Sequence, residues 1–246
     1  MKLSFSGKTV LVTGGNCGIA LALAPLLIGE GLFPILCHRH GTGAAKIDEH
    51  LSPWAGQYAT AFFDLACPEQ MGALFADHPG IDYLVDMAQG DYETLVASAD
   101  PGRLARYMAE NIGARAELVR LAARAMVGHR FGRMIFVSSA AAGMPGKGQG
   151  LYSASKLGAE GIYRSAGLEL ASRGVTAMGL RPGYVASGRG DRFIEQQGQG
   201  LVKKMPGGCF ISAAEVARAL VFFLSDTARH FNGVAITMDG GFSAGK

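Results

Sequence analysis

The sequence predicts an α/β fold in which helices cover both faces of a seven-stranded parallel sheet. Apolar runs of four to six residues, rich in Val, Ile and Phe, alternate along the chain with longer segments of helical periodicity. The runs VLVTGG, PILCH, DYLVD and MIFVSS are apolar on both faces, as strands buried inside a parallel sheet are. Right-handed crossovers between such strands give a doubly wound sheet.

The periodicity places each element along the chain. We expect strands near 8–13, 33–38, 58–63, 81–86, 133–138, 175–181 and 234–237. The longest helices are expected over 101–127 and 152–172, and Pro25 is expected to kink or loosen the first crossover helix because it lacks an amide donor. No linker, repeat or charge block divides residues 1–246, so we assign them to one domain. The long, polar and Gly-rich stretch 186–211 is predicted to be a mobile substrate lid.

Composition narrows the class of protein. A hydrophobic fraction of 49% with 17% charged residues supports a large buried core. The net charge of +3 is too small to indicate nucleic-acid binding. The four cysteines are widely spaced without a CxxC pair, which indicates reduced thiols and no metal site. The first residues lack a signal-peptide core and the uncharged stretch 9–29 is broken by glycines and Pro25, so we expect no membrane span and a cytoplasmic location.

A glycine-rich turn follows the first predicted strand. Gly14, Gly15 and Gly18 would let the backbone approach a pyrophosphate at a helix N-terminus, as at the first βα turn of dinucleotide-binding folds. An ordinary strand-to-helix connection is the alternative interpretation.

A second candidate group consists of Ser139, Tyr152 and Lys156. Tyr152 and Lys156 are four residues apart, so on a helix they share one face. Because a tyrosine titrates near pH 10 without perturbation, a neighbouring ammonium is needed to bring its proton exchange towards working pH. The alternative is a half-exposed helix that happens to carry a Tyr and a Lys.

Two further motifs, RPGYVAS and GVAITMDGGFS, follow the last two predicted strands. With them, residues 8–243 resemble the classical short-chain dehydrogenases/reductases, because the glycine motif, Asp64, Asn111, Ser139, Tyr152, Lys156, Pro182 and Gly183 occur in that family's order. In that family the catalytic serine precedes the catalytic tyrosine by 13 residues, so the resemblance favours Ser139 over its neighbour Ser138 as the partner of Tyr152. The resemblance implies a single Rossmann domain and an NAD(P)-dependent oxidoreductase acting on CH–OH or C=O groups.

The family's catalytic roles would fall on four residues of this chain. Tyr152 would be the general acid in reduction, and Ser139 would bind the reacting oxygen. Lys156 would bind the nicotinamide ribose and lower the Tyr152 pKa, while Asn111 would hold a water that passes protons to Lys156. Asp64 would bind the adenine amino group and Ser187 the carboxamide.

The full set of cofactor contacts implied by the resemblance is Gly14, Asn16, Cys17, Gly18, Ile19, His38, Arg39, Asp64, Leu65, Ala88, Tyr152, Lys156, Pro182, Gly183, Val185 and Ser187.

The residues at the end of the second strand indicate which cofactor is preferred. It reads Cys37, His38, Arg39, His40 and lacks the acid that NAD enzymes place against the ribose 2′-hydroxyl. A guanidinium can pair with a 2′-phosphate, so NADP(H) is favoured over NAD(H), with Arg39 as the main contact. A solvated basic turn is the alternative.

The chain departs from the family pattern at three places. Ala20 replaces the last glycine of the glycine motif, and Cys17 stands where carrier-protein reductases often have Arg. The usual NNAG after strand four is Asp86-Met87-Ala88-Gln89, which puts a carboxyl where a neutral amide normally braces the sheet.

Among subfamilies, the segments HRFGRMIFVSS and ASRGVTAMGLRPGYV look most like the β-ketoacyl-acyl-carrier-protein reductases. Arg130 and Arg173 fall where those enzymes dock an acidic carrier protein, which suggests a carrier-bound 3-oxoacyl thioester as substrate and a role in fatty acid or polyketide biosynthesis. The alternatives are a dehydrogenase or reductase of a free small-molecule alcohol or ketone, and a catalytically idle subunit of the same fold. The resemblance also implies a homo-oligomer, a tetramer or dimer.

Overall fold

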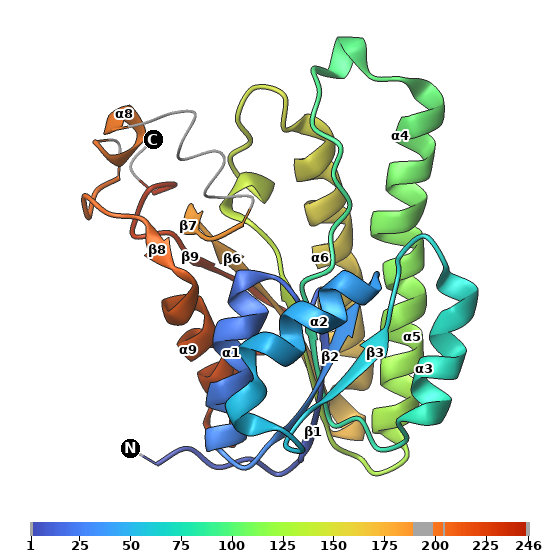
Figure 1. Ribbon diagram of the computed structural model, residues 1–246. Helices are drawn as coiled ribbons and strands as arrows, with labels where there is room; N and C mark the ends of the chain where they lie inside the picture. The colour runs from blue at the N-terminus through green and yellow to red at the C-terminus, as the bar shows by residue number, and fades with distance from the viewer. Residues whose placement is uncertain (1, 189–198, 204, 245–246) are drawn as a thin grey trace.

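Figure 1 shows the computed structural model, in which a central sheet is layered between two groups of helices. The structure describes residues 2–188, 199–203 and 205–244. All neighbouring strands of the main sheet are parallel, in the order β3-β2-β1-β4-β5-β6-β9. This is the doubly wound Rossmann arrangement predicted from the alternating pattern. The strands are β1 (Thr9–Thr13), β2 (Phe33–His38), β3 (Ala59–Phe62), β4 (Tyr83–Asp86), β5 (Gly132–Val137), β6 (Val175–Pro182) and β9 (Ala235–Met238).

The helices form two layers, each with its own apolar core. Helices α1, α2 and α9 bury Leu23, Ile47 and Leu220 against one face of the sheet. Helices α3, α5 and α6 bury Leu74, Leu118 and related side chains against the other face (Figure 1). The α-helices are α1 (Gly18–Gly29), α2 (Gly41–His50), α3 (Met71–Asp77), α4 (Pro101–Met108), α5 (Ala114–Val127), α6 (Gly150–Leu170), α8 (Gln199–Val202) and α9 (Ala213–Leu224).

The long helix expected over 101–127 is interrupted in its middle. A π-helical turn, Ala109–Gly113, separates α4 from α5 and contains Asn111. Such turns are rare and often lie at functional sites. The helical periodicity predicts a continuous α-helix because it does not distinguish the locally wider turn. By contrast, α1 runs without a break from Gly18 to Gly29 with Pro25 inside it.

Only part of the predicted lid, 186–211, belongs to the described residues. β7 (Val185–Ala186) pairs in parallel with β8 (Ile211–Ser212), and α8 lies between them in the chain. Residues 189–198 and 204 lie outside the described part, so the lid stays a prediction. In the centre of the main sheet, Thr13 on β1 is in register with Asp86 on β4, and the carboxyl ends of these strands face the pocket described next.

Candidate active site

One large cleft of about 1070 Å³ opens along the carboxyl ends of the strands. Its walls come from the turns after β1, β2, β3, β4, β5 and β6, and from the start of α6. In doubly wound sheets, ligands bind at this edge. Most of the predicted contacts line it, including Gly14, Asn16, Cys17, Gly18, Ile19, His38, Arg39, Asp64, Leu65, Ala88, Ser139, Tyr152, Lys156, Pro182, Gly183, Val185 and Ser187.

The glycine turn after β1 makes a backbone cradle at the start of α1. Gly14 has a φ of +66°, and a Cβ on Gly15 would lie 2.7 Å from the Cys37 nitrogen, so side chains are excluded at both positions. Cys17 caps α1, because its Sγ accepts a hydrogen bond from the Ala20 nitrogen at 3.4 Å. Burial raises the pKa of the Cys17 thiol. Ala20 itself is fully buried in the core, so its methyl group packs against the sheet.

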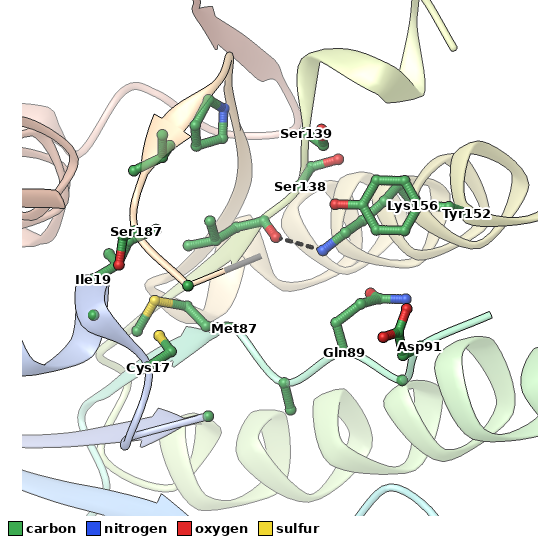
Figure 2. Close-up of a pocket in the computed structure, with 18 of the residues that line it drawn as sticks. Cys17, Ile19, Met87, Gln89, Asp91, Ser138, Ser139, Tyr152, Lys156 and Ser187 are labelled. Atoms are coloured by element: carbon green, nitrogen blue, oxygen red, sulfur yellow. Dashed lines mark hydrogen bonds between the residues drawn. The ribbon is translucent and has the colours of Figure 1, made fainter. Parts of the chain in front are cut away.

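A Cβ on Gly18 would lie 1.8 Å from Ser187 Oγ, so the turn after β6 reaches the first residue of α1. Figure 2 shows Ser187 beside Ile19 at this point. Gly183 donates its amide to the Met238 carbonyl at 2.9 Å, and Val185 pairs with Ile211. These contacts hold the turn after β6 over the N-terminus of α1. The turn and the helix N-terminus together form the kind of cradle that binds a pyrophosphate.

The end of β2 presents a group of basic side chains to the cleft. Arg39 is exposed and donates through Nε to His40 Nε2 at 3.1 Å. His38 Nδ1 is buried and has no hydrogen-bond partner among the described residues. Lys46, from α2, lines the same region. An unpaired buried nitrogen beside two cations fits an anionic ligand group at this point.

On the adjoining wall, Asp64 and Leu65 follow β3. Asp64 Oδ1 accepts a hydrogen bond from the Ala66 nitrogen at 3.0 Å, which holds the carboxylate at the rim of the cleft. The cradle, the basic end of β2 and this carboxylate all line one cleft. The residues present therefore fit a nicotinamide dinucleotide.

The Tyr152 and Lys156 side chains lie together on α6, facing the cleft (Figure 2). Lys156 is 3% exposed, and its Nζ donates to the Val137 carbonyl at 2.9 Å. The same Nζ lies 4.7 Å from the Phe136 ring centre and 5.7 Å from the Tyr152 ring centre. A buried ammonium is thus held beside the tyrosine ring by the strand β5 that it packs against.

The two serines after β5 have different surroundings. Ser138 is buried and donates to Glu160 Oε1 at 2.5 Å, and Arg181 donates to the same oxygen through Nε at 2.7 Å. Ser139 is half-buried, and its Oγ accepts a hydrogen bond from the Ala141 nitrogen at 3.1 Å. Both line the cleft, but the Ser138 proton is committed to Glu160. Ser139 is therefore the better placed of the two to donate to a ligand.

Asn111 lies behind the wall of the cleft and does not line it. Its Oδ1 accepts from the Gly90 nitrogen at 2.8 Å, and its Nδ2 donates to the Tyr107 carbonyl at 2.9 Å. Its own carbonyl accepts a hydrogen bond from Arg115. Asn111 thus braces the turn after β4 from the π-helical turn.

The carboxyl of Asp86, for which the sequence offers no account, has a buried partner. Arg115 on α5 donates through Nε to Asp86 Oδ2 at 2.6 Å, and both side chains are 0% exposed. Tyr163 donates to the same oxygen at 3.0 Å, and Thr13 donates to Oδ1 at 2.7 Å. Burial, together with the Asp86 charge, raises the pKa of Tyr163 well above its usual value. Both oxygens of the Asp86 carboxylate therefore accept hydrogen bonds, and its charge is balanced by Arg115.

Arg130 and Arg173 lie at the other end of the sheet. They precede β5 and β6, whereas the cleft lies at the carboxyl ends of these strands. Both are exposed, and Arg130 adopts a φ of 55° with its Nη2 donating to the Ser172 carbonyl at 3.0 Å. The two arginines are therefore neighbours on the surface, away from the cleft of their own chain.

Several residues that line the cleft were not predicted. Lys46, Gln89, Asp91, Glu110 and Gln149 contribute polar groups. An apolar end is formed by Met144, Tyr184 and Phe242, with the Tyr184 and Phe242 ring centres 5.4 Å apart. Lys46 could have been predicted from the sequence, because it lies just over one turn into α2, the helix that follows the basic end of β2. For Gln89 the sequence signal is its departure from the NNAG pattern.

The short chain dehydrogenase family model matches residues 8–198, and the chain belongs to this family. It is an NAD(P)-dependent oxidoreductase acting on CH–OH and C=O groups, as the sequence predicted. Among the described helices, none is long and apolar enough to cross a membrane. The described residues also include no group of three or more His, Cys, Asp or Glu side chains placed to hold a metal ion.

Curated relatives align over almost the whole chain. The 3-oxoacyl-(acyl-carrier-protein) reductase FabG of Rickettsia felis is 31% identical, covering 97% of this chain and 98% of the relative. FabG of Salmonella typhimurium is 29% identical, with coverage of 97% and 98%. The reductase MabA of Mycobacterium bovis is 30% identical, with coverage of 99% and 96%.

Solved structures agree on the fold. A short chain dehydrogenase/reductase family protein superposes with a TM-score of 0.87 at 26% identity, covering 99% of this chain and 100% of that one. An NAD⁺-bound xylitol dehydrogenase superposes with a TM-score of 0.88 at 22% identity, with coverage of 96% and 99%, and supports the fold alone.

Proposed function

We propose that the protein is an NADPH-dependent reductase that converts a 3-oxoacyl thioester, carried by an acyl-carrier protein, to the 3-hydroxyacyl form. The observation that carries the chemistry is the buried Lys156 ammonium held beside Tyr152 in the cleft. The choice of substrate rests on the FabG and MabA relatives, which are named as reductases of this substrate.

The proposed mechanism uses Tyr152, Lys156 and Ser139. When bound, the reduced nicotinamide supplies a hydride to the carbonyl carbon. Tyr152 donates its phenolic proton to the carbonyl oxygen as negative charge develops there, and Ser139 donates a hydrogen bond to that oxygen. Lys156 stabilises the tyrosinate that remains and binds the nicotinamide ribose hydroxyls, while its Val137 contact keeps the ammonium in place. Asn111, whose side chain is bonded to Gly90 and Tyr107 behind the wall of the cleft, would keep the turn after β4 in place, and the proton-relay water implied by the resemblance stays a proposal.

NADPH is preferred over NADH in this proposal because of the end of β2. Arg39 and Lys46 supply positive charge, and no acid stands at residues 37–40 to repel a 2′-phosphate. A guanidinium pairs with phosphate through charge-assisted hydrogen bonds. The unpartnered Nδ1 of His38 is a further donor in its protonated or Nδ1–H form.

The carrier protein would dock on Arg130 and Arg173. Because these arginines lie away from their own cleft, the proposal requires that an oligomer brings them beside the cleft of a neighbouring chain. Two exposed leucines on α6, Leu157 (45% exposed) and Leu168 (74% exposed), lie eleven residues apart and so on one face of the helix. Exposed apolar side chains on one helix face support a homo-oligomer, a tetramer or dimer, formed through this helix.

A second candidate is reduction of a free ketone or oxidation of a free alcohol. The polar side chains of Gln89, Asp91 and Gln149 in the cleft favour it, because they suit a small hydroxylated molecule better than an acyl chain. The test is a panel of acyl thioesters, ketones and alcohols assayed by absorbance with NADPH, NADH and the oxidised cofactors. Highest kcat/KM on a 3-oxoacyl thioester with NADPH supports the first candidate. Turnover of free ketones or alcohols alone selects the second.

A further inference from the structure

The turn after β4 is fixed by the elements on both sides of it. Thr13 Oγ1 accepts hydrogen bonds from the nitrogens of Met87 at 3.0 Å and Ala88 at 3.1 Å. Arg115 donates to the Ala88 carbonyl, and Asn111 accepts from Gly90. With the backbone held on either side of residue 89, the direction of its side chain is set. Figure 2 shows Gln89 directed from this turn towards the side of the cleft where Tyr152 and Lys156 lie.

The orientation of the Gln89 amide follows from its neighbours. Its Nε2 donates to the Tyr107 hydroxyl at 2.9 Å and to Ser155 Oγ at 3.3 Å. Ser155 gives its own proton to the Tyr152 carbonyl at 2.8 Å, so its Oγ can face Gln89 only as an acceptor. This requirement places the nitrogen, and not the oxygen, towards Ser155.

The amide oxygen is left without a partner. Gln89 Oε1 is buried, and no donor among the described residues reaches it. A buried acceptor without a hydrogen bond is costly, and such atoms are uncommon in native structures. The Gln89 side chain lines the cleft beside Tyr152 and Lys156, so a ligand bound in the cleft can supply the hydrogen-bond donor that Oε1 lacks.

We propose that Gln89 is a ligand-binding specificity residue whose Oε1 accepts a hydrogen bond from a hydroxyl group brought into the cleft beside Tyr152 and Lys156. The proposal rests on the proposed function, since it assumes a cofactor and a carbonyl or alcohol substrate in this cleft. Either can carry the hydroxyl: the ribose of the cofactor, or a hydroxylated substrate. In both cases Gln89 selects ligands that present an O–H donor at this position.

The test is the isosteric variant Gln89→Met, compared with Gln57→Met, which changes an exposed glutamine away from the cleft. Gln89→Met is expected to fold, because the Tyr107 and Ser155 hydroxyls still bond to each other at 3.1 Å. Thermal unfolding checks this. The dissociation constant of NADPH is then measured by its fluorescence without substrate, and KM is measured for the best substrate of the panel. Loss of one neutral hydrogen bond is expected to raise the affected constant about 3- to 10-fold.

The two measurements, the dissociation constant of NADPH and the KM of the substrate, distinguish the source of the hydroxyl. A raised dissociation constant for NADPH assigns it to the cofactor, and a raised KM with unchanged NADPH binding assigns it to the substrate. If both constants match those of Gln57→Met, the proposal is overturned. That result leaves the proposed function intact provided that turnover still depends on Tyr152, so the two can fail separately.

Discussion

Arg115 donates through Nε to Asp86 at 2.6 Å where neither side chain has any exposed surface. The same guanidinium donates to the carbonyls of Asn111 and Ala88, so it joins α5 to the strand β4 and to the turn that lines the cleft. This pair explains how an acid is tolerated at position 86, where the sequence pattern of the family leads us to expect a neutral amide. The carboxylate and the guanidinium are complementary charges, and each would be buried without its main partner if the other were removed.

The stability of the protein is expected to depend on both members of this pair. Removing one partner of a buried pair leaves an uncompensated charge, so Arg115→Met should cost about 3–5 kcal/mol of unfolding free energy. The double variant Asp86→Asn/Arg115→Met removes both charges and should recover most of that loss. Urea unfolding at neutral pH measures both variants together with the single variant Asp86→Asn. Simple addition of the two single losses in the double variant would show that the residues do not act as a pair.

The Arg39 guanidinium is expected to decide between the two cofactors. Arg39→Asp replaces a cation with an acid at the end of β2, which should lower kcat/KM with NADPH and raise it with NADH. Steady-state kinetics with both cofactors measure the ratio. Lys46→Asp, on the adjacent helix, tests whether charge on α2 contributes to the same preference. A wild-type preference for NADH, or an unchanged ratio in Arg39→Asp, would contradict the assignment.

The arginines at the amino ends of β5 and β6 give a prediction about the partner. Reversal of Arg130 and Arg173 to Glu should raise KM for the carrier-bound substrate and make that KM less sensitive to salt, because the attraction to the acidic carrier protein is removed. Each exposed charge pair contributes only about 0.2–1 kcal/mol, which limits the size of the effect. A short thioester substrate serves as the control and should be unaffected. Equal losses on both substrates would indicate that these arginines support the fold, for example through the bond from Arg130 to the Ser172 carbonyl.

The sequence was informative where the signal is local. The strands, the glycine turn and the pair Tyr152 and Lys156 were predictable because each depends on spacing within one element. The partner of Asp86 was not predicted, since Arg115 lies 29 residues further on and meets it only through packing of α5 on the sheet. Helical spacing does place Arg115 on the buried face, four residues after Asn111, and a charged residue there indicates a buried partner without identifying it.

Lys156 has two roles in the proposed mechanism, and its substitution should show both. Lys156→Ala removes the ammonium beside Tyr152 and the donor to the ribose, so turnover should fall and NADPH should bind more weakly. Fluorescence titration of NADPH separates the second effect from the first. Normal cofactor affinity in this variant would mean that Lys156 acts on Tyr152 alone.

The central claim is that Tyr152 gives the proton to the carbonyl oxygen, and Tyr152→Phe tests it most directly. The phenyl ring keeps the packing on α6 but has no proton to donate, so the fold and the dissociation constant of NADPH should remain near those of the wild type. Turnover of the best carbonyl substrate should fall about 10²- to 10⁴-fold, the usual effect of removing a positioned proton donor. Retention of wild-type turnover by a folded, NADPH-binding Tyr152→Phe variant would contradict the account, because another group would then supply the proton.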